Sequence, residues 1–247
     1  SFMKRGMKIH TSSKVSSYSA IDNSINAVIE ETTGGGRATV SVDKIFVMIG
    51  RAPNTEGVGL EELGVKTAGG FVETGDYYRT NIESIYAIGD IAANSPMLAH
   101  VASKQGEIAA EHIAGHTPRR PRIDETEIPA VVFCDPEAAS FGLTEGQAAA
   151  RNIPFAKASF PFRACGKAVA VDDCEGFVKV LSDPSTKKIL GAHIAGSGAS
   201  ELIHELLLAK CAGLGVEDIA EMIHAHPTLS EAVMESARAA LGRAVHI

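Results

Sequence analysis

The sequence predicts a mixed protein, α/β in its first part and α+β in its last, and three stretches carry this prediction. Short alternating apolar segments fill residues 1 to about 50, an apolar run ends in Gly89-Asp90 ahead of a helical stretch, and strands alternate with helices from about residue 125. With 247 residues, 45% of them hydrophobic, the chain can bury substantial cores in one large or two to three small domains.

The composition argues against several classes of protein. The formal net charge of −7 at pH 7 disfavours a nucleic-acid or anionic-membrane surface. No apolar run approaches the roughly 20 residues that cross a bilayer, and no signal-peptide pattern occurs. Cys134, Cys165, Cys174 and Cys211 form neither a metal-type C-x-x-C nor a disulfide framework, so we expect reduced thiols in an intracellular protein. No His, Cys and carboxylate spacing predicts a metal site.

Residues 1–55 predict a β-meander and then a buried strand. Apolar segments at Val15, 27–29 and 38–40, with a glycine turn at 34–36, indicate the meander. The run Lys44–Gly50 is continuous and apolar, as expected for a strand buried on both faces, and the turn residues of Gly50–Thr55 end it.

Residues 56–122 centre on an apolar strand, Ser84–Ile91, that ends in Gly89-Asp90. Asp90 would then lie at the carboxyl end of a strand, where open α/β sheets place ligands, although a lone Gly-Asp pair equally suits a turn cap. A helix is predicted from Met97, Leu98, Ala99 and His100 to Gly115, and its N-terminal amides would favour a negatively charged group. A basic, proline-rich strip at 117–122 predicts a linker with a solvated face.

Residues 123–247 predict an α+β domain. The expected elements are a strand at 129–133, a helix from 144, a hairpin of 176–181 with 188–194, and a helix over 199–212. The 199–212 helix and a terminal helix with Val233, Met234, Ala237 and Leu241 offer more apolar surface than a small domain needs for its own core. We therefore expect self-association as a dimer.

The stretch Ile223–Glu231 is the candidate catalytic site. His226 precedes Glu231 by five residues across a proline, and a carboxylate on one ring nitrogen would orient the imidazole for proton exchange. The spacing from Thr228 to Glu231 also suits a capping box, in which Glu231 is only a cap and His226 only a turn residue. His224 could support the pair.

The run from His224 to Ala232 resembles the C-terminal signature of the dihydrolipoamide dehydrogenase family of flavoprotein pyridine nucleotide-disulfide reductases, and the resemblance extends back through nearly all of the chain. It implies that His226 takes a proton from a dihydrolipoamide thiol, that Glu231 orients it, and that both serve a site on the partner subunit of a homodimer. It also implies FAD and NAD as cofactors and the lipoyl domains of 2-oxoacid dehydrogenase complexes as partners. The compartment would be the mitochondrial matrix or the bacterial cytoplasm.

The same resemblance assigns the three parts of the chain. Residues 1–55 would end a nicotinamide-binding domain, because Gly50–Thr55 is similar to its closing G-R-x-P-N-T segment. Residues 56–122 would be the C-terminal part of an FAD-binding domain, with Asp90 on the ribityl chain and Met97, Leu98, Ala99 and His100 at the flavin. Residues 123–247 would be the interface domain.

Two features of the family do not occur in this sequence. The redox cysteine pair with four intervening residues is absent, and no G-x-G-x-x-G opens a βαβ unit. The sequence therefore looks like the C-terminal half of a longer protein, and we expect it alone to retain neither FAD nor NAD. The alternatives are a catalytically silent dimerisation or partner-binding module, and a fragment of glutathione, trypanothione or mercuric reductase.

Overall fold

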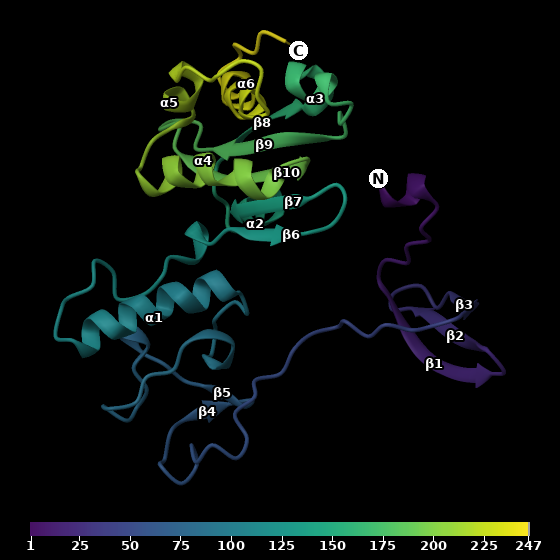
Figure 1. Cartoon of the computed structure of the whole chain (residues 1–247), viewed down its shortest axis with the longest axis vertical. Helices are drawn as coiled ribbons and strands as arrows, with labels where there is room; N and C mark the ends of the chain where they lie inside the picture. The colour runs from purple at the N-terminus through teal and green to yellow at the C-terminus, as the bar shows by residue number, and fades with distance from the viewer. Residues whose placement is uncertain (247) are drawn as a thin grey trace. The chain divides into compact units, whose positions relative to one another are not determined.

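The structure, a computed structural model, describes residues 1–246 and divides the chain into two compact units, one of residues 1–52 and one that begins at Pro53 (Figure 1). The first unit holds a short 3-10 helix, Phe2–Arg5, and an antiparallel sheet. The strands of this sheet, in spatial order, are β1 (Ser13–Ile21), β2 (Ser24–Glu31) and β3 (Arg37–Val42). The predicted meander is confirmed, with its glycine turn between β2 and β3.

The prediction of a buried strand at Lys44–Gly50 is wrong. These residues form no strand, and the four large side chains at its centre are between 72% and 95% exposed: Phe46, Val47, Met48 and Ile49. A strand needs hydrogen-bonding neighbours on its edges, and no strand of residues 1–246 pairs with this segment. The apolar run therefore stays extended and unpaired.

The part of the second unit before residue 123 is thinly packed. It contains a hairpin, two 3-10 helices and one long helix: β4 (Thr67–Ala68), β5 (Phe71–Val72), η2 (Asp76–Tyr78), η3 (Gly89–Ile91) and α1 (Ala99–Ile113). Its buried apolar cluster consists of Val65, Val72 and Ala87. The predicted helix is confirmed, with Gly115 in a left-handed conformation just beyond its end.

The strand predicted at Ser84–Ile91 is replaced by an extended segment. It makes one antiparallel bridge, between Tyr86 and Arg79, and then turns into η3 at Gly89. The described residues supply no further neighbour for it, so a full strand does not form. Asp90 consequently lies in a 3-10 turn.

The basic strip at 117–122 is anchored rather than only solvated. The Arg122 guanidinium donates to the Thr74 carbonyl at 3.0 Å and lies 5.4 Å from the centre of the Tyr78 ring. Arg120 forms an ion pair with Glu127 in η4 (Glu125–Glu127). These contacts tie the strip to residues on both sides of it.

The rest of the second unit is built on a five-stranded antiparallel sheet of order β6-β7-β10-β9-β8. Its strands are β6 (Ala130–Val132), β7 (Ala138–Gly142), β8 (Ala156–Pro161), β9 (Gly176–Ser182) and β10 (Ile189–Gly196). Its helices are α2 (Glu145–Ala150), η5 (Phe162–Ala164), α3 (Gly166–Ala170), α4 (Ala199–Cys211), α5 (Val216–Glu221) and α6 (Ser230–Ala240). The strand, hairpin and helices predicted here are confirmed.

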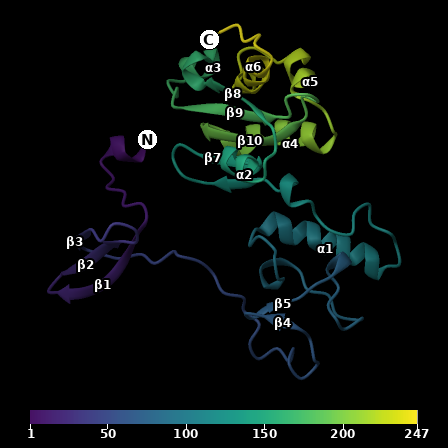
Figure 2. The ribbon, with the colours of Figure 1, turned by 180° about the vertical axis from the view of Figure 1, so that it is seen from behind.

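One face of this sheet carries the main core. Val178, Val180 and Ile194 alternate with Lys179 and His193 on the strands, so the apolar set points to one side. Helix α4 packs on β7 and β10, and α6 packs on β8 and β9 (Figure 1). Figure 2 shows α3 near the β8 edge of the sheet.

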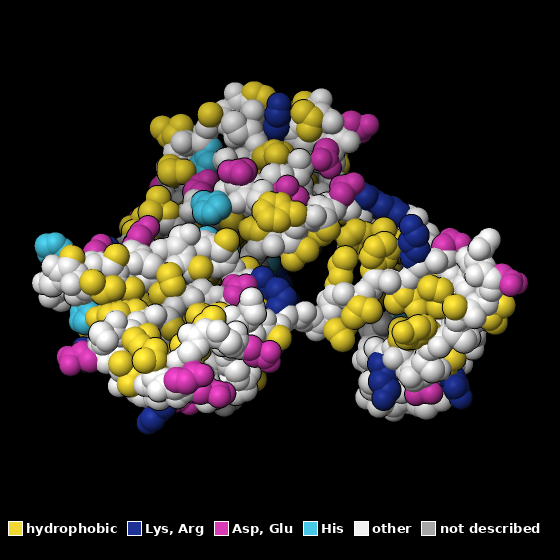
Figure 3. Space-filling model, turned by 60° about the horizontal axis from the view of Figure 1, so that its bottom comes forward, with side chains coloured by type: hydrophobic (Ala, Val, Ile, Leu, Met, Phe, Trp, Pro, Cys, Tyr) yellow, Lys and Arg dark blue, Asp and Glu magenta, His cyan; other side chains and the backbone are white. Residues whose placement is uncertain are grey.

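The prediction that the terminal helix has a spare apolar face is wrong. Val233 and Ala237 have no exposed surface, and Met234 is 9% exposed, because α6 packs these side chains into the domain's own core. On α4, Leu208 is 70% exposed. Scattered hydrophobic side chains lie among charged ones on the face that Figure 3 displays. No helix within residues 1–246 is long and apolar enough to span a membrane.

Candidate functional site

The sequence-predicted pair does come together. The Nδ1 atom of His226 lies 2.9 Å from Oε1 of Glu231, in the first turn of α6. The His226 side chain is 76% exposed, whereas that of Glu231 is 21% exposed. A ring that donates from Nδ1 to the carboxylate keeps Nε2 as its proton acceptor. The geometry is that of an oriented, accessible general base.

The other carboxylate oxygen of Glu231 holds the entering chain. It accepts the Thr228 N–H at 2.9 Å, which is the half of a capping box that the spacing predicted. The other half does not form, because the Thr228 hydroxyl donates to the Ala225 carbonyl at 2.7 Å and Leu229 takes the cap position. Glu231 therefore acts both as a cap and as the partner of His226.

The environment of Glu231 favours its ionised form. Burial raises the pKa of this carboxyl, but hydrogen bonds from the Thr228 N–H and from His226 outweigh burial, and the pKa lies below its ordinary value. An ionised carboxylate is the form that stabilises a positive charge developing on His226.

His224 anchors the same loop to α4. Its buried ring places Nε2 at 2.8 Å from Oε1 of Glu205 and Nδ1 at 3.1 Å from the Met222 carbonyl. Both partners accept, so only a ring that carries both protons donates to both at once. The support predicted for His224 takes the form of this anchor, and Glu205 is a residue that sequence reasoning missed.

The predicted cofactor-binding residues gather around the start of α1. The buried N–H of Gly89 donates to the Gln105 side chain at 2.6 Å, and Gln105 in turn donates to Ser95 at 2.7 Å, which holds η3 and Asp90 beside the helix. Leu98 caps α1 without a side-chain hydrogen bond. The first-turn amides of Ala99 and His100 thus have no side-chain cap, as an anion-binding helix end requires.

The side chains in this group differ in their surroundings. Met97 and Leu98 are half-buried, whereas Ala99 and His100 are exposed. His100 uses Nε2 in a 2.8 Å contact with the Pro129 carbonyl, which ties the start of α1 to the start of the sheet domain. The structure therefore assigns His100 a structural contact that its predicted role did not include.

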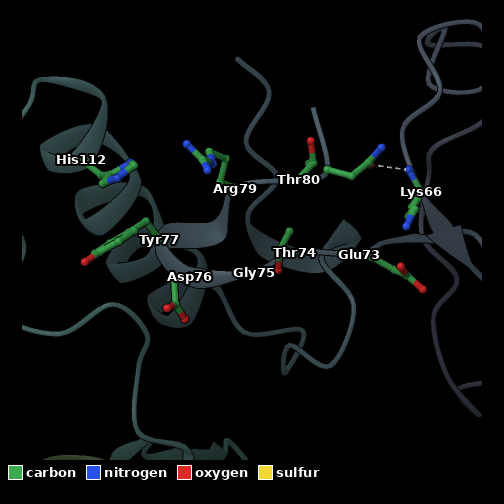
Figure 4. Close-up of a pocket in the computed structure, with 10 residues that line it drawn as sticks. Lys66, Glu73, Thr74, Gly75, Asp76, Tyr77, Arg79, Thr80 and His112 are labelled. Atoms are coloured by element: carbon green, nitrogen blue, oxygen red, sulfur yellow. Dashed lines mark hydrogen bonds between the residues drawn. The ribbon is translucent and has the colours of Figure 1, made fainter. Parts of the chain in front are cut away.

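A polar pocket of about 540 Å³ was not foreseen from the sequence (Figure 4). The His112 ring stacks on Tyr77 at 4.1 Å between centroids and meets the Tyr86 hydroxyl at 2.8 Å. Figure 4 shows the two stacked rings at one end of the pocket and Lys66 at the other. No periodicity could have revealed it, because these residues come from separate segments.

Comparison with known domains places the chain in a family. The description "Pyridine nucleotide-disulphide oxidoreductase" matches residues 1–106, and "Pyridine nucleotide-disulphide oxidoreductase, dimerisation domain" matches residues 128–237. The chain belongs to the pyridine nucleotide-disulphide oxidoreductases, whose members use FAD and NAD. This membership confirms the predicted fold class.

Within that family the similar curated proteins are dihydrolipoyl dehydrogenases. Those of Haloferax volcanii and Bacillus subtilis are 42% and 43% identical over 98% and 99% of this chain. A mitochondrial dihydrolipoyl dehydrogenase of Arabidopsis thaliana is 40% identical over 100%. The chain spans about half the length of these relatives. The resemblance drawn from the run His224 to Ala232 is confirmed.

Two solved structures have a fold similar to that of this chain. The crystal structure of LpdA from Mycobacterium tuberculosis matches 96% of this chain with a TM-score of 0.84 and 29% identity, over 50% of that protein. RclA, a flavoprotein disulfide reductase of Escherichia coli, matches 91% with a TM-score of 0.81 at 23% identity, which shows the fold alone.

Proposed function

We propose that this chain provides the acid-base half of a dihydrolipoyl dehydrogenase, an enzyme that oxidises a dihydrolipoyl dithiol and passes the electrons to NAD. The observation that carries the proposal is the 2.9 Å contact between Nδ1 of His226 and Glu231, with the ring exposed to a reactant. The dihydrolipoyl dehydrogenases that match nearly the whole chain support the choice of dithiol.

The proposed chemistry follows from the acidity of thiols. An unperturbed thiol has a pKa of about 8.5, so most of it is protonated at neutral pH, and only the thiolate attacks a disulfide. His226 would accept the thiol proton at Nε2 and return it later. Glu231 would hold the ring in the correct tautomer and stabilise the imidazolium that forms.

Asp90 and the start of α1 would hold one side of the FAD. Uncapped amides at the helix end suit the negative charge of a reduced flavin, and Asp90 offers a carboxylate acceptor for ribityl hydroxyls. When bound, FAD would supply the redox chemistry between the dithiol and NAD. The proposed domain limits are 1–55 and 56–122 for the two cofactor-binding parts and 123–247 for the interface domain.

The proposed assembly is a homodimer in which His226 and Glu231 serve the partner subunit's site. The match of residues 128–237 to a dimerisation domain supports the homodimer. The lipoyl domains of 2-oxoacid dehydrogenase complexes would be the protein partners. The enzyme would work in the mitochondrial matrix or in the bacterial cytoplasm, since both bacterial and mitochondrial relatives occur.

A catalytically silent dimerisation module is the competing proposal. It is favoured by one observation: Cys134, Cys165, Cys174 and Cys211 are all free thiols, so the described residues supply no redox disulfide for His226 to serve.

The test compares His226→Gln with Glu231→Gln in a protein completed with the N-terminal half of its relatives. Replacing His226 should lower dihydrolipoamide oxidation by about 10²–10⁴-fold, the usual share of a general base, and replacing Glu231 should lower it less. His204→Gln, an exposed histidine on α4, is the matched control. Quinone reduction by NADH bypasses the thiols and should survive all three changes. Unchanged dithiol turnover in His226→Gln would refute the proposal, and a completed protein without any dithiol activity would favour the silent module.

A further inference from the structure

We propose that Cys165 and Gly166, at the start of α3, position the His226–Glu231 pair. Neither residue would touch a reacting atom. Cys165 acts through the backbone of Thr228, and Gly166 acts by leaving room beside the imidazole ring. The inference rests on the proposed function, because it takes His226 to be the proton acceptor.

The loop that carries His226 needs such support. Ile223 is 95% exposed, and Ala225, His226 and Pro227 are exposed as well. A loop with so little buried surface is held by its polar contacts. The His224–Glu205 contact anchors the loop on the N-terminal side of His226. A second anchor, on the C-terminal side, would hold the loop at both ends.

Cys165 supplies that second anchor. Its thiol lies 3.4 Å from the Thr228 carbonyl and can donate to it. The residue is 3% exposed and belongs to the main core, together with Phe162 and Ala168 on either side of it. Cys165 therefore joins an exposed loop to a rigid part of the domain.

Three hydrogen bonds in series link Cys165 to the imidazole. The Thr228 carbonyl accepts from Cys165, and the Thr228 N–H donates to Oε2 of Glu231 at 2.9 Å. The other oxygen of Glu231 contacts Nδ1 of His226 at 2.9 Å. Both backbone polar groups of Thr228 are thus used, and a shift of Thr228 would move the carboxylate that orients the ring.

Gly166 determines how closely the ring can approach α3. A Cβ atom added at Gly166 would lie 3.9 Å from Cε1 of His226, the carbon between the two ring nitrogens. A methyl group would therefore be in ordinary contact with the ring, and a longer side chain would crowd it. Gly166 has no positive φ, so a larger residue at this position meets the ring rather than backbone strain.

Three variants and two controls test the structural part in this chain. Cys165→Ala removes the donor, Cys165→Ser keeps a donor, and Gly166→Leu crowds the ring. The matched controls are Cys134→Ala, whose thiol also donates to a carbonyl, that of Pro136, at 3.1 Å, and Gly146→Leu, at a helical glycine in open space. NMR of ¹³C-labelled glutamate follows the titration of Glu231, and the ring resonances report on His226.

We expect both Cys165→Ala and Gly166→Leu to move the Glu231 titration upward, toward its ordinary range. Cys165→Ala should weaken the hydrogen bond from the Thr228 N–H, and Gly166→Leu should weaken the one from His226, and each of these bonds lowers the pKa of Glu231. Cys165→Ser and both controls should keep the wild-type titration. Should Cys165→Ala fail to fold, Cys165→Val removes the donor while filling the buried site, and Gly166→Leu tests the ring contact at a position that is exposed. An unchanged Glu231 titration and unchanged His226 resonances in the folded variants would overturn the proposal.

Kinetics in the completed protein test its consequence. Cys165→Ala should lower kcat for dihydrolipoamide oxidation by about 2- to 10-fold, the worth of one ordinary hydrogen bond, with KM little changed. Gly166→Leu should lower it by up to about 10²-fold, since a misplaced base is costly. Cys165→Ser should recover most of the loss. A wild type without dithiol activity would refute the proposed function but leave the NMR test intact, whereas full kcat in both Cys165→Ala and Gly166→Leu would refute the positioning role.

Discussion

Residues 123–246 and residues 53–122 belong to the same compact unit but differ in how much they bury. The main core cluster lies wholly in the first of these regions, among β7 to β10, η5, α3 and α4 to α6. The buried cluster in residues 53–122 has three members, and five further apolar side chains are buried outside it: Tyr78, Ala92, Val101, Ile108 and Ala109. Residues 123–246 contain an antiparallel sheet that is covered by their own helices, whereas residues 53–122 contain extended segments without strand partners. Stability should therefore be concentrated in the region that carries His226 and Glu231.

Two phenylalanines give the strongest test of this difference in burial. Phe162 has no exposed surface and lies against Gly196, whereas Phe46 is 75% exposed. Phe162→Ala should cost about 3–5 kcal/mol of the free energy of unfolding of its domain. Phe46→Ala should change it by no more than about 0.5 kcal/mol. Denaturant unfolding measures both, and equal effects would contradict the assignment of the core.

Flavin retention tests the thinly packed region. We expect the chain to lose FAD completely on gel filtration, because Asp90 and the end of α1 offer contacts on one side only and no glycine-rich loop is present for the pyrophosphate. Absorbance of the eluted protein gives the answer. A yellow protein with one flavin per chain would show that residues 53–122 form a complete site.

Self-association tests the well-packed region. We expect a dimer at micromolar concentration through residues 123–247, in keeping with the dimerisation domain matched at 128–237. The buried face of α6 cannot contribute, so the contact must use exposed residues such as Leu208 of α4. Sedimentation velocity distinguishes the two states, and a monomer throughout the concentration range would argue against the expectation.

The smallest expected effect concerns the outer face of the sheet. Side-chain hydrogen bonds from Lys157 and Lys179 lower the pKa of Glu145 from 4.5 to about 2. A lowered pKa stabilises the fold fully above pH 4.5, and this contribution is lost as the pH falls toward 2. Glu145→Gln should lower the melting temperature slightly at pH 7, less in high salt, and least at pH 2. A difference as large at pH 2 as at pH 7 would assign the effect to packing.

Local patterns explain the elements that could be predicted. The hairpin of β9 and β10 follows from the turn residues between two adjacent apolar runs, and α1 and α4 follow from helical periodicity. The contact of His226 with Glu231 could be anticipated because Glu231 follows five positions later, across a helix start. The strand expected at Lys44–Gly50 failed because an apolar composition shows only that a segment is suited to burial, whereas burial and pairing depend on a second segment.

The sequence by itself determined the family, the order of the helices and hairpins after residue 123, and the pairing of His226 with Glu231. Each depends on residues that are neighbours in the chain or on a contiguous signature. Three features could be seen only in the tertiary structure. Glu205 contacts His224, and the Cys165 thiol contacts a carbonyl 63 positions away. The apolar face of α6 packs against the domain's own core. Such contacts arise when packing of the sheet against its helices brings distant segments together, and that packing is a property of the whole domain rather than of any one segment.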